Sequence, residues 1–148
     1  MHTTRPLDVM IVEDEGILAM DLEYLLEKAG HRVAGWATCL DEARELSTRI
    51  EPDLVLVDLH LTDGVTGLDV AELMRRAGPA VVVFMTANPR LIPEDFLGAV
   101  GVIAKPYTSA GVLAALRFLQ QGITDPPPTL QQPIGLTLAP AYQRSWVH

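Results

Sequence analysis

Cysteine, aromatic residues and basic residues are all scarce in this chain. The single cysteine, Cys39, excludes an internal disulfide and a zinc site built from cysteines. Aromatic residues make up only 5% of the sequence while hydrophobic residues reach 49%, so aliphatic side chains must build the core. The 11 basic residues face 19 acidic ones, and the resulting net charge of −8 argues against nucleic-acid binding, which needs clustered lysines and arginines.

Long apolar runs are missing as well. No stretch approaches the ~18 apolar residues that a membrane-spanning helix needs, and the N-terminal MHTTRPLD lacks the apolar core of a signal peptide. We therefore expect a cytoplasmic protein that does not enter the membrane. A chain of 148 residues predicts one domain with a sizeable core.

Shorter apolar runs are present, and they predict a parallel sheet. Continuous apolar stretches bounded by turn signals are typical of strands buried on both faces. Five such stretches occur: LDVMIV (7–12), HRVAGWA (31–37), DLVLV (53–57), AVVVF (80–84) and VGVIA (100–104).

The intervals between these runs mostly show the spacing of amphipathic helices. We expect helices over 16–29, 67–77 and 109–121, and a further one capped by Thr38 with its apolar face formed by Ala43, Leu46 and Ile50. Strand and helix thus alternate, which predicts an open, doubly wound α/β sheet with helices on both faces.

Two segments break this alternation. In 86–99, Pro89 and Pro93 forbid a long helix, so we expect only a short helix after Pro93. Residues 122–148 begin with a stiff proline-rich stretch, yet are too apolar for a solvated tail. The predicted organisation is a domain over 1–121 followed by this tail.

Reactive side chains stand where the predicted strands end. The first strand is followed by Glu13 and Asp14, the third by Asp58, the fourth by Thr86 and the fifth by Lys105. Ligands of open α/β sheets bind beyond the carboxyl ends of the strands, so these side chains are expected to share one site.

Such a site predicts a particular chemistry. Three crowded carboxylates repel one another. The repulsion energy of two unit charges ~4 Å apart is about 4 kcal/mol at an effective dielectric constant of 20. Because all the expected ligands are hard oxygens, the cluster favours Mg²⁺. Asp58 could accept a phosphoryl group as an acyl phosphate, with Lys105 neutralising its charge and Thr86 donating a hydrogen bond.

Each of these residues also has a structural interpretation when taken singly. Asp58 could cap the following turn, Glu13 and Asp14 could favour a helix N-terminus, Thr86 could be structural, and Lys105 could be a solvated loop residue. Their ordered appearance at four strand ends favours the shared site.

The ordered set resembles the receiver domain of bacterial two-component response regulators. The matching stretches are VMIVEDE, PDLVLVDLHLTDGVTGLD, VVVFMTAN and VGVIAKPY, and they cover about residues 6 to 121. The resemblance implies a flavodoxin-like, five-stranded parallel sheet of order 2-1-3-4-5. It is similar to the stand-alone receivers of some α-proteobacteria.

The resemblance also implies roles for individual residues. Asp58 would be the phosphoacceptor, and Glu13, Asp14 and Asp58 would hold Mg²⁺ together with the backbone carbonyl of His60. Thr86, with Ala87 beside it, and Lys105 would bind the phosphoryl group. The peptide bond between Lys105 and Pro106 would be cis.

This sequence departs from the family pattern at two of these places. Many receivers have an aromatic residue or histidine three positions before the lysine. This chain has Val102 there, so the resemblance does not imply coupling between the threonine and an aromatic ring. Glu13 replaces the commoner aspartate, which should retune the metal site. Tyr107 could belong to an output face or simply pack in its loop.

The resemblance implies a sensor histidine kinase or a histidine phosphotransfer protein as phosphodonor, with signalling through protein–protein interaction. Ile17, Met20 and Tyr24 form a second apolar stripe on the first helix, which is either a docking surface for the kinase or a wider core face. The tail could dock on a second copy by adding GLTL to a sheet edge, which would give a homodimer, or it could pack back on its own chain.

Two other functions stay open on the sequence alone. An aspartyl-phosphate phosphatase also uses an aspartate at a strand end, but it needs a second aspartate two residues later, where His60 stands. A binding module that keeps the fold without being phosphorylated would not need Asp14, Asp58, Thr86 and Lys105 together.

Overall fold

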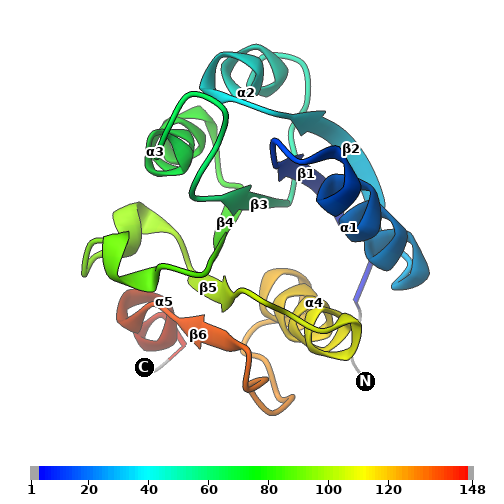
Figure 1. Cartoon of the computed structure of the whole chain (residues 1–148). Coiled ribbons are helices and arrows are strands. Elements are labelled where there is room, and N and C mark those ends of the chain that lie inside the picture. The colour runs from blue at the N-terminus through cyan, green and yellow to red at the C-terminus, as the bar shows by residue number, and fades with distance from the viewer. Residues whose placement is uncertain (1–3, 147–148) are drawn as a thin grey trace.

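The five apolar runs form adjacent parallel strands of one sheet in the computed structural model, which describes residues 4–146. The strands are β1 (Asp8–Val12), β2 (Arg32–Ala37), β3 (Leu54–Asp58), β4 (Val81–Thr86) and β5 (Gly101–Ala104). A short sixth strand, β6 (Leu136–Leu138), pairs antiparallel with β5, so the order is β2-β1-β3-β4-β5-β6. The predicted order of the parallel strands is confirmed, and the chain's own tail extends it (Figure 1).

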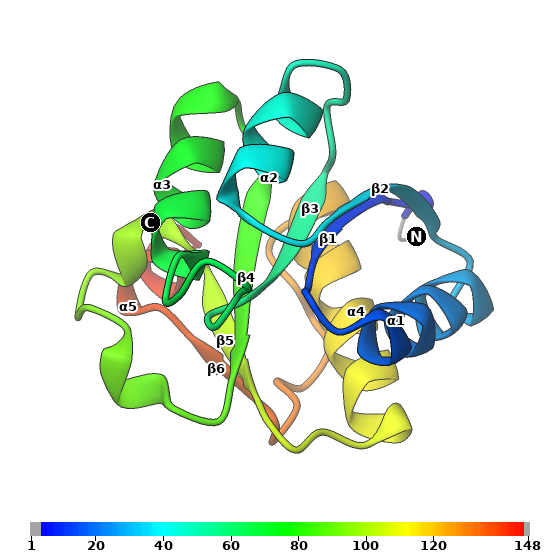
Figure 2. The ribbon, with the colours of Figure 1, turned by 45° about the horizontal axis from the view of Figure 1, so that its top comes forward.

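Helices cover both faces of this sheet, as the alternating pattern predicts (Figures 1 and 2). One face carries α1 (Gly16–Lys28) and α4 (Ser109–Thr124), which bury leucines such as Leu22 and Leu116 against Leu54 and Leu56. The other face carries α2 (Leu40–Ser47) and α3 (Gly67–Ala77) over Val55, Val57 and Phe84. Strands covered on both faces must be apolar throughout, which explains their continuous runs.

Helix α2 differs from the expectation at both ends. Cys39 occupies the N-cap position, and the hydroxyl and backbone N–H of Thr38 both donate to the Glu42 carboxylate, at 2.6 and 2.7 Å. Thr38 therefore does not cap the helix through its own side chain. The helix ends at Ser47, so Ile50 packs against the core from the turn that follows.

The segment between β4 and β5 contains two short 3₁₀ turns, η1 (Pro89–Leu91) and η2 (Phe96–Gly98). The sequence predicts a short helix after Pro93, where η2 lies, but it does not predict the turn that starts at Pro89. Phe96 and Leu97 adopt φ values of 56° and 50°, which bulky residues rarely do. The sequence signals no reason for these left-handed conformations. In the structure the Asp95 carboxylate accepts a hydrogen bond from the Leu97 backbone N–H at 3.0 Å.

The C-terminal tail folds back on its own chain, which is one of the two alternatives left open by the sequence. Strand β6 lies along β5, and a short helix, α5 (Pro140–Arg144), follows it. Tyr142 and Trp146 pack against the core cluster that contains Phe118. In this structure the GLTL stretch adds to the β5 edge of its own chain. A homodimer formed through the tail stays a prediction.

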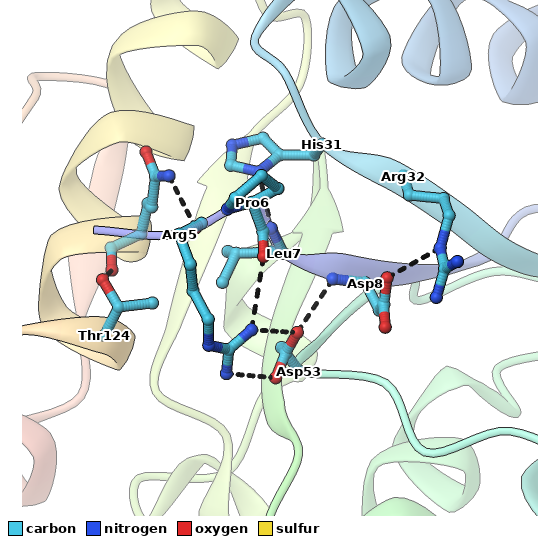
Figure 3. A network of polar contacts seen from close by, with 9 residues as sticks. Arg5, Pro6, Leu7, Asp8, His31, Arg32, Asp53 and Thr124 are labelled. Carbon is cyan, nitrogen blue, oxygen red and sulfur yellow. Dashed lines mark hydrogen bonds and ion pairs between the residues drawn. The ribbon is translucent and has the colours of Figure 1, made fainter. Parts of the chain in front are cut away.

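A polar network connects the N-terminal segment to the start of β3 (Figure 3). It lies at the edge of the sheet where the parallel strands begin, opposite the edge formed by their carboxyl ends. The guanidinium of Arg5 donates two hydrogen bonds to the Asp53 carboxylate, at 2.8 and 2.9 Å. The same carboxylate accepts from the backbone N–H of Asp8 at 2.8 Å. Asp53 therefore aligns the start of β3 with the start of β1.

Candidate functional site

The carboxyl ends of the neighbouring strands β1, β3, β4 and β5 bring together the predicted side chains. Asp58 is the last residue of β3 and Thr86 the last of β4, while Glu13 follows β1 and Lys105 follows β5. All four strands are parallel, so their ends meet at one edge of the sheet. The arrangement places the acids, the hydroxyl and the ammonium in a single site.

Three carboxylates form the acidic part of the site. Oxygen atoms of Glu13, Asp14 and Asp58 lie within 4.8 Å of one another. Glu13 is buried, and its Oε1 atom has no hydrogen-bond partner among residues 4–146. Burial, together with a hydrogen bond and charge from Asp58, raises the pKa of Glu13 to about 8. An unpartnered buried carboxylate oxygen in a cluster of hard ligands fits a divalent cation such as Mg²⁺.

Lys105 reaches into this acidic cluster from β5. Its Nζ lies 2.9 Å from Oδ2 of Asp58 and 3.6 Å from Oε2 of Glu13. Burial by itself lowers the pKa of Lys105, but the hydrogen bonds and charges of Asp58 and Glu13 outweigh it and raise that pKa. The ammonium is therefore charged at neutral pH. The Lys105–Pro106 peptide bond is cis.

The backbone around Asp58 and Thr86 completes the site. Asp58 Oδ1 accepts a hydrogen bond from the backbone N–H of His60 at 3.1 Å. The buried Thr86 hydroxyl oxygen accepts from the backbone N–H of Asn88 at 2.9 Å, which leaves the hydroxyl proton to be donated. Ala87, between them, is exposed beside the site. The metal role of the His60 carbonyl and the phosphoryl role of Ala87 stay predictions.

Two residues that support the site are not found by the sequence reasoning. Gly67 begins α3 directly behind the phosphoacceptor candidate, and a Cβ atom there would lie 2.3 Å from the Asp58 carbonyl oxygen and 2.7 Å from Leu59 Cα. Trp36 donates its indole N–H to the Glu13 carbonyl oxygen at 2.7 Å. Both contact backbone atoms of another segment, and no residue pattern along the chain signals such contacts.

The apolar stripe on α1 faces solvent. Ile17, Met20 and Tyr24 are 84%, 68% and 62% exposed, so the stripe is not a wider core face. Trp36, 47% exposed, lines a small hollow together with Met20. Met20 therefore connects Trp36 to this stripe. The docking role of Ile17, Met20 and Tyr24 stays a prediction. Tyr107, in contrast, packs against the core, and burial raises the pKa of its hydroxyl to about 12.

This fold and this site define a class of signalling protein. The family model of the response regulator receiver domain matches residues 9–117. The chain therefore belongs to the receiver domain family of two-component response regulators, as its motifs suggest.

Among individual relatives, it is 37% identical over 119 residues to the phyllosphere-induced regulator PhyR of Methylorubrum extorquens, covering 77% of this chain and 45% of that protein. It is 32% identical over 112 residues to the chemotaxis protein CheY of Thermotoga maritima, covering 73% of this chain and 92% of CheY. The chain thus spans about half the length of PhyR and nearly the whole of CheY.

Solved structures agree with this assignment. The receiver domain of the PhyR response regulator from Erythrobacter litoralis has a TM-score of 0.71 and 29% identity, covering 84% of this chain and 97% of that domain. The PhyR response regulator of Brucella abortus gives a TM-score of 0.68 at 31% identity, covering 81% of this chain and 49% of that one. Within residues 4–146, no helix is long and apolar enough to cross a membrane.

Proposed function

We propose that this receiver accepts a phosphoryl group on Asp58 from a histidine kinase or a histidine phosphotransfer protein. The observation that carries the proposal is the pairing of Lys105 Nζ with Asp58 Oδ2 at 2.9 Å, beside two further carboxylates. A partly buried ion pair at a strand end, next to an unpartnered acid, is a poor way to gain stability. It is well suited to binding a group with several negative charges.

The proposed reaction is a phosphoryl transfer between a nitrogen and an oxygen. A carboxylate oxygen of Asp58 forms a bond to phosphorus while the bond between phosphorus and the donor imidazole breaks, and the imidazole leaves with the bonding electron pair. The Lys105 ammonium neutralises charge on the phosphoryl oxygens, and the free Thr86 proton is donated to one of them. Asp58 is the acceptor because its carboxylate is the one paired with the lysine at hydrogen-bond distance.

A divalent cation completes this charge balance. Glu13, Asp14 and Asp58 would hold Mg²⁺, and the orphaned Oε1 of Glu13 is the atom that most needs it. When bound, the ion offsets negative charge on both the acids and the transferred group. Without it, the raised pKa of Glu13 keeps much of that carboxyl protonated at neutral pH.

The phosphodonor docks, in this proposal, on the exposed surface of Ile17, Met20, Tyr24 and Trp36. Exposed aliphatic and aromatic side chains on one helix face suit the apolar face of a partner helix. The surface lies next to the acidic pair that follows β1, so a docked donor would approach the phosphoacceptor. The chain then signals in the cytoplasm as a binding partner for another protein, and not as a conventional enzyme.

A PhyR from Bartonella quintana has been crystallised with the anti-sigma factor NepR, and this chain aligns to 33% of that PhyR chain with a TM-score of 0.51 at 35% identity. This supports a protein as the downstream partner of our chain. Because the alignment spans so little of that PhyR, NepR itself is not assigned as the partner.

A labelling experiment tests the phosphoacceptor. The full chain is incubated with Mg²⁺ and radiolabelled acetyl phosphate, and the product is tested for the alkali lability of an acyl phosphate. Label should be lost in Asp58→Asn and retained in Asp69→Asn, an exposed acid in the first turn of α3. Equal label in wild type and Asp58→Asn would refute the assignment.

A second experiment tests the docking surface separately. Ile17→Glu should leave labelling by acetyl phosphate unchanged and slow transfer from a phosphorylated histidine kinase or phosphotransfer domain. Leu91→Glu, which alters an exposed apolar side chain elsewhere, serves as the control. If Ile17→Glu is folded and accepts the phosphoryl group from the protein donor at the wild-type rate, docking does not occur on α1.

A further inference from the structure

Residues 129–146, which we call the C-terminal clasp, are bound along the β5 edge of the sheet. Leu138, Thr137 and Leu136 pair antiparallel with Gly101, Val102 and Ile103, respectively. The pairing continues at both ends, because Ala139 N–H donates to the Val100 carbonyl at 2.8 Å and Ala104 N–H donates to the Gly135 carbonyl at 3.2 Å. The clasp thus holds β5 along its full length.

Two glycines of the receiver leave space for the close approach of this clasp. A Cβ atom on Gly101 would lie 2.6 Å from the Thr137 carbonyl oxygen, so only glycine lets β6 approach this closely. A Cβ atom on Gly122 of α4 would lie 2.9 Å from the hydroxyl oxygen of Tyr142. Two glycines in separate elements therefore make room for two separate parts of the clasp.

Polar and aromatic contacts fix both ends of the clasp to α4. The carbonyl oxygen of the buried Gln121 side chain accepts hydrogen bonds from the backbone N–H groups of Thr129 and Leu130, at 2.7 and 3.0 Å. At the other end, the Trp146 ring lies edge-on to Phe118, with ring centroids 6.2 Å apart. These contacts place the clasp in a defined position.

The clasp is connected to the phosphoacceptor site by the consecutive residues Ala104 and Lys105. Ala104 N–H is held by the Gly135 carbonyl on the clasp side, and the next N–H, that of Lys105, donates to the Thr86 carbonyl at 2.9 Å on the β4 side. The backbone from which the Lys105 side chain extends toward Asp58 is therefore held from both sides. Releasing one side would free the last residue of β5 to move.

We propose that the C-terminal clasp is a positioning segment for Lys105, and that its docking is coupled to occupation of the Asp58 site. This inference rests on the proposed phosphoacceptor function. Because coupling between two binding equilibria is reciprocal, a clasp that favours binding of a phosphoryl group at Asp58 is itself bound more tightly once that group is present.

Variants that loosen the clasp at two separate places test the coupling in the full chain. Gly101→Ala pushes β6 away from β5, while Trp146→Ala removes the aromatic anchor far from the site. The measured quantity is the concentration of beryllium fluoride, an acyl phosphate mimic, that half-saturates the site with Mg²⁺ present. For both variants the half-saturating concentration of beryllium fluoride should be at least about fivefold higher than for wild type. A change of about fivefold is the lower end of typical coupling effects. Trp146→Phe should restore the wild-type value, and the fully exposed Ile134→Ala should keep it.

The reciprocal measurement uses hydrogen exchange of the wild-type chain. Beryllium fluoride with Mg²⁺ should slow exchange of the Ala104 and Ala139 amides. The coupling is refuted if both loosened variants are folded by circular dichroism and bind the mimic as wild type does, or if exchange at both amides is unchanged in the saturated protein. If wild type neither binds the mimic nor accepts label at Asp58, it is the proposed function that fails.

Discussion

The Lys105 ammonium lies 2.9 Å from the Asp58 carboxylate, although 47 residues separate them in the chain. Adjacent parallel strands do not explain this contact, because β4 lies between β3 and β5. The long lysine side chain instead crosses the end of β4. The partners of the Lys105 ammonium therefore come from several strand ends along the carboxyl edge of the sheet, and not only from the neighbouring strand.

Replacing this lysine should impair phosphorylation more than folding. Lys105→Gln removes the cation that faces the transferred group, and the loss of one such stabilising group predicts a rate of labelling by acetyl phosphate that falls about 100-fold. The control is Lys28→Gln, which removes an exposed lysine from the last turn of α1. Equal rates for the two variants would show that Lys105 does not act on the phosphoryl group.

Gly67 should tolerate no side chain. In Gly67→Ala the new Cβ would overlap the Asp58 carbonyl oxygen, and both are backbone-fixed, so we expect a loss of about 1–3 kcal/mol in the free energy of unfolding. Gly78→Ala is the matched control, because its Cβ would meet no heavy atom of the described chain within 4 Å and its φ of 167° suits any residue. Urea denaturation measures both, and a Gly67→Ala midpoint equal to that of Gly78→Ala contradicts the steric argument.

The success of the sequence prediction has a physical cause. Strands buried on both faces must be apolar at every position, so the runs around Val55 and Val83 are visible without knowledge of their neighbours. Polar residues at the ends of such runs then predict a shared site, since parallel strands align their carboxyl ends. Strand β4 ends at Thr86, two residues beyond the predicted run, because Thr86 pairs with Ala104 of β5. That pairing depends on a neighbouring strand, so the run itself does not reveal it.

The features that escaped prediction depend on contacts between separate secondary-structure elements. Gly67 and Gly101 look like ordinary glycines until the opposing backbone is in place. The three residues of β6 form a strand only because β5 offers a free edge, so the sequence could indicate an edge strand but not whose edge it joins. The same holds for Trp36, whose partner is a backbone carbonyl.

Magnesium binding should depend on pH through Glu13. Because its pKa is raised to about 8, a proton competes with the metal across the neutral range. Below that pKa the Mg²⁺ affinity should fall with each lower pH unit, by up to about tenfold. Calorimetric titrations at pH 8, 7 and 6 measure this, and Glu13→Gln should show weaker binding with a flatter profile. Glu15→Gln, which changes the exposed neighbouring acid, should keep the wild-type slope.

His31 should make the fold less stable in mild acid. The side chain is buried, its Nδ1 accepts from the Leu7 backbone N–H at 3.0 Å, and its Nε2 has no partner within residues 4–146. Burial lowers the pKa of His31 in the folded state, so the unfolded chain binds the proton first. The stability that the neutral ring contributes is complete above the ordinary histidine pKa of about 6.5, and it is lost as the pH falls through that value toward the lower folded pKa.

The stability profile of His31→Asn isolates this effect, because the asparagine carbonyl can still accept from Leu7 while carrying no titratable proton. Urea denaturation between pH 7.5 and 5 should show a flatter decline for this variant than for wild type. His60→Asn, which alters an exposed histidine, should keep the wild-type decline. Glu13 acts in the opposite direction, since its raised folded pKa gives stability that is lost as the pH rises from 4.5 to about 8, but it is common to all three proteins and cancels in the differences. A wild-type slope in His31→Asn would place the acid sensitivity elsewhere in the chain.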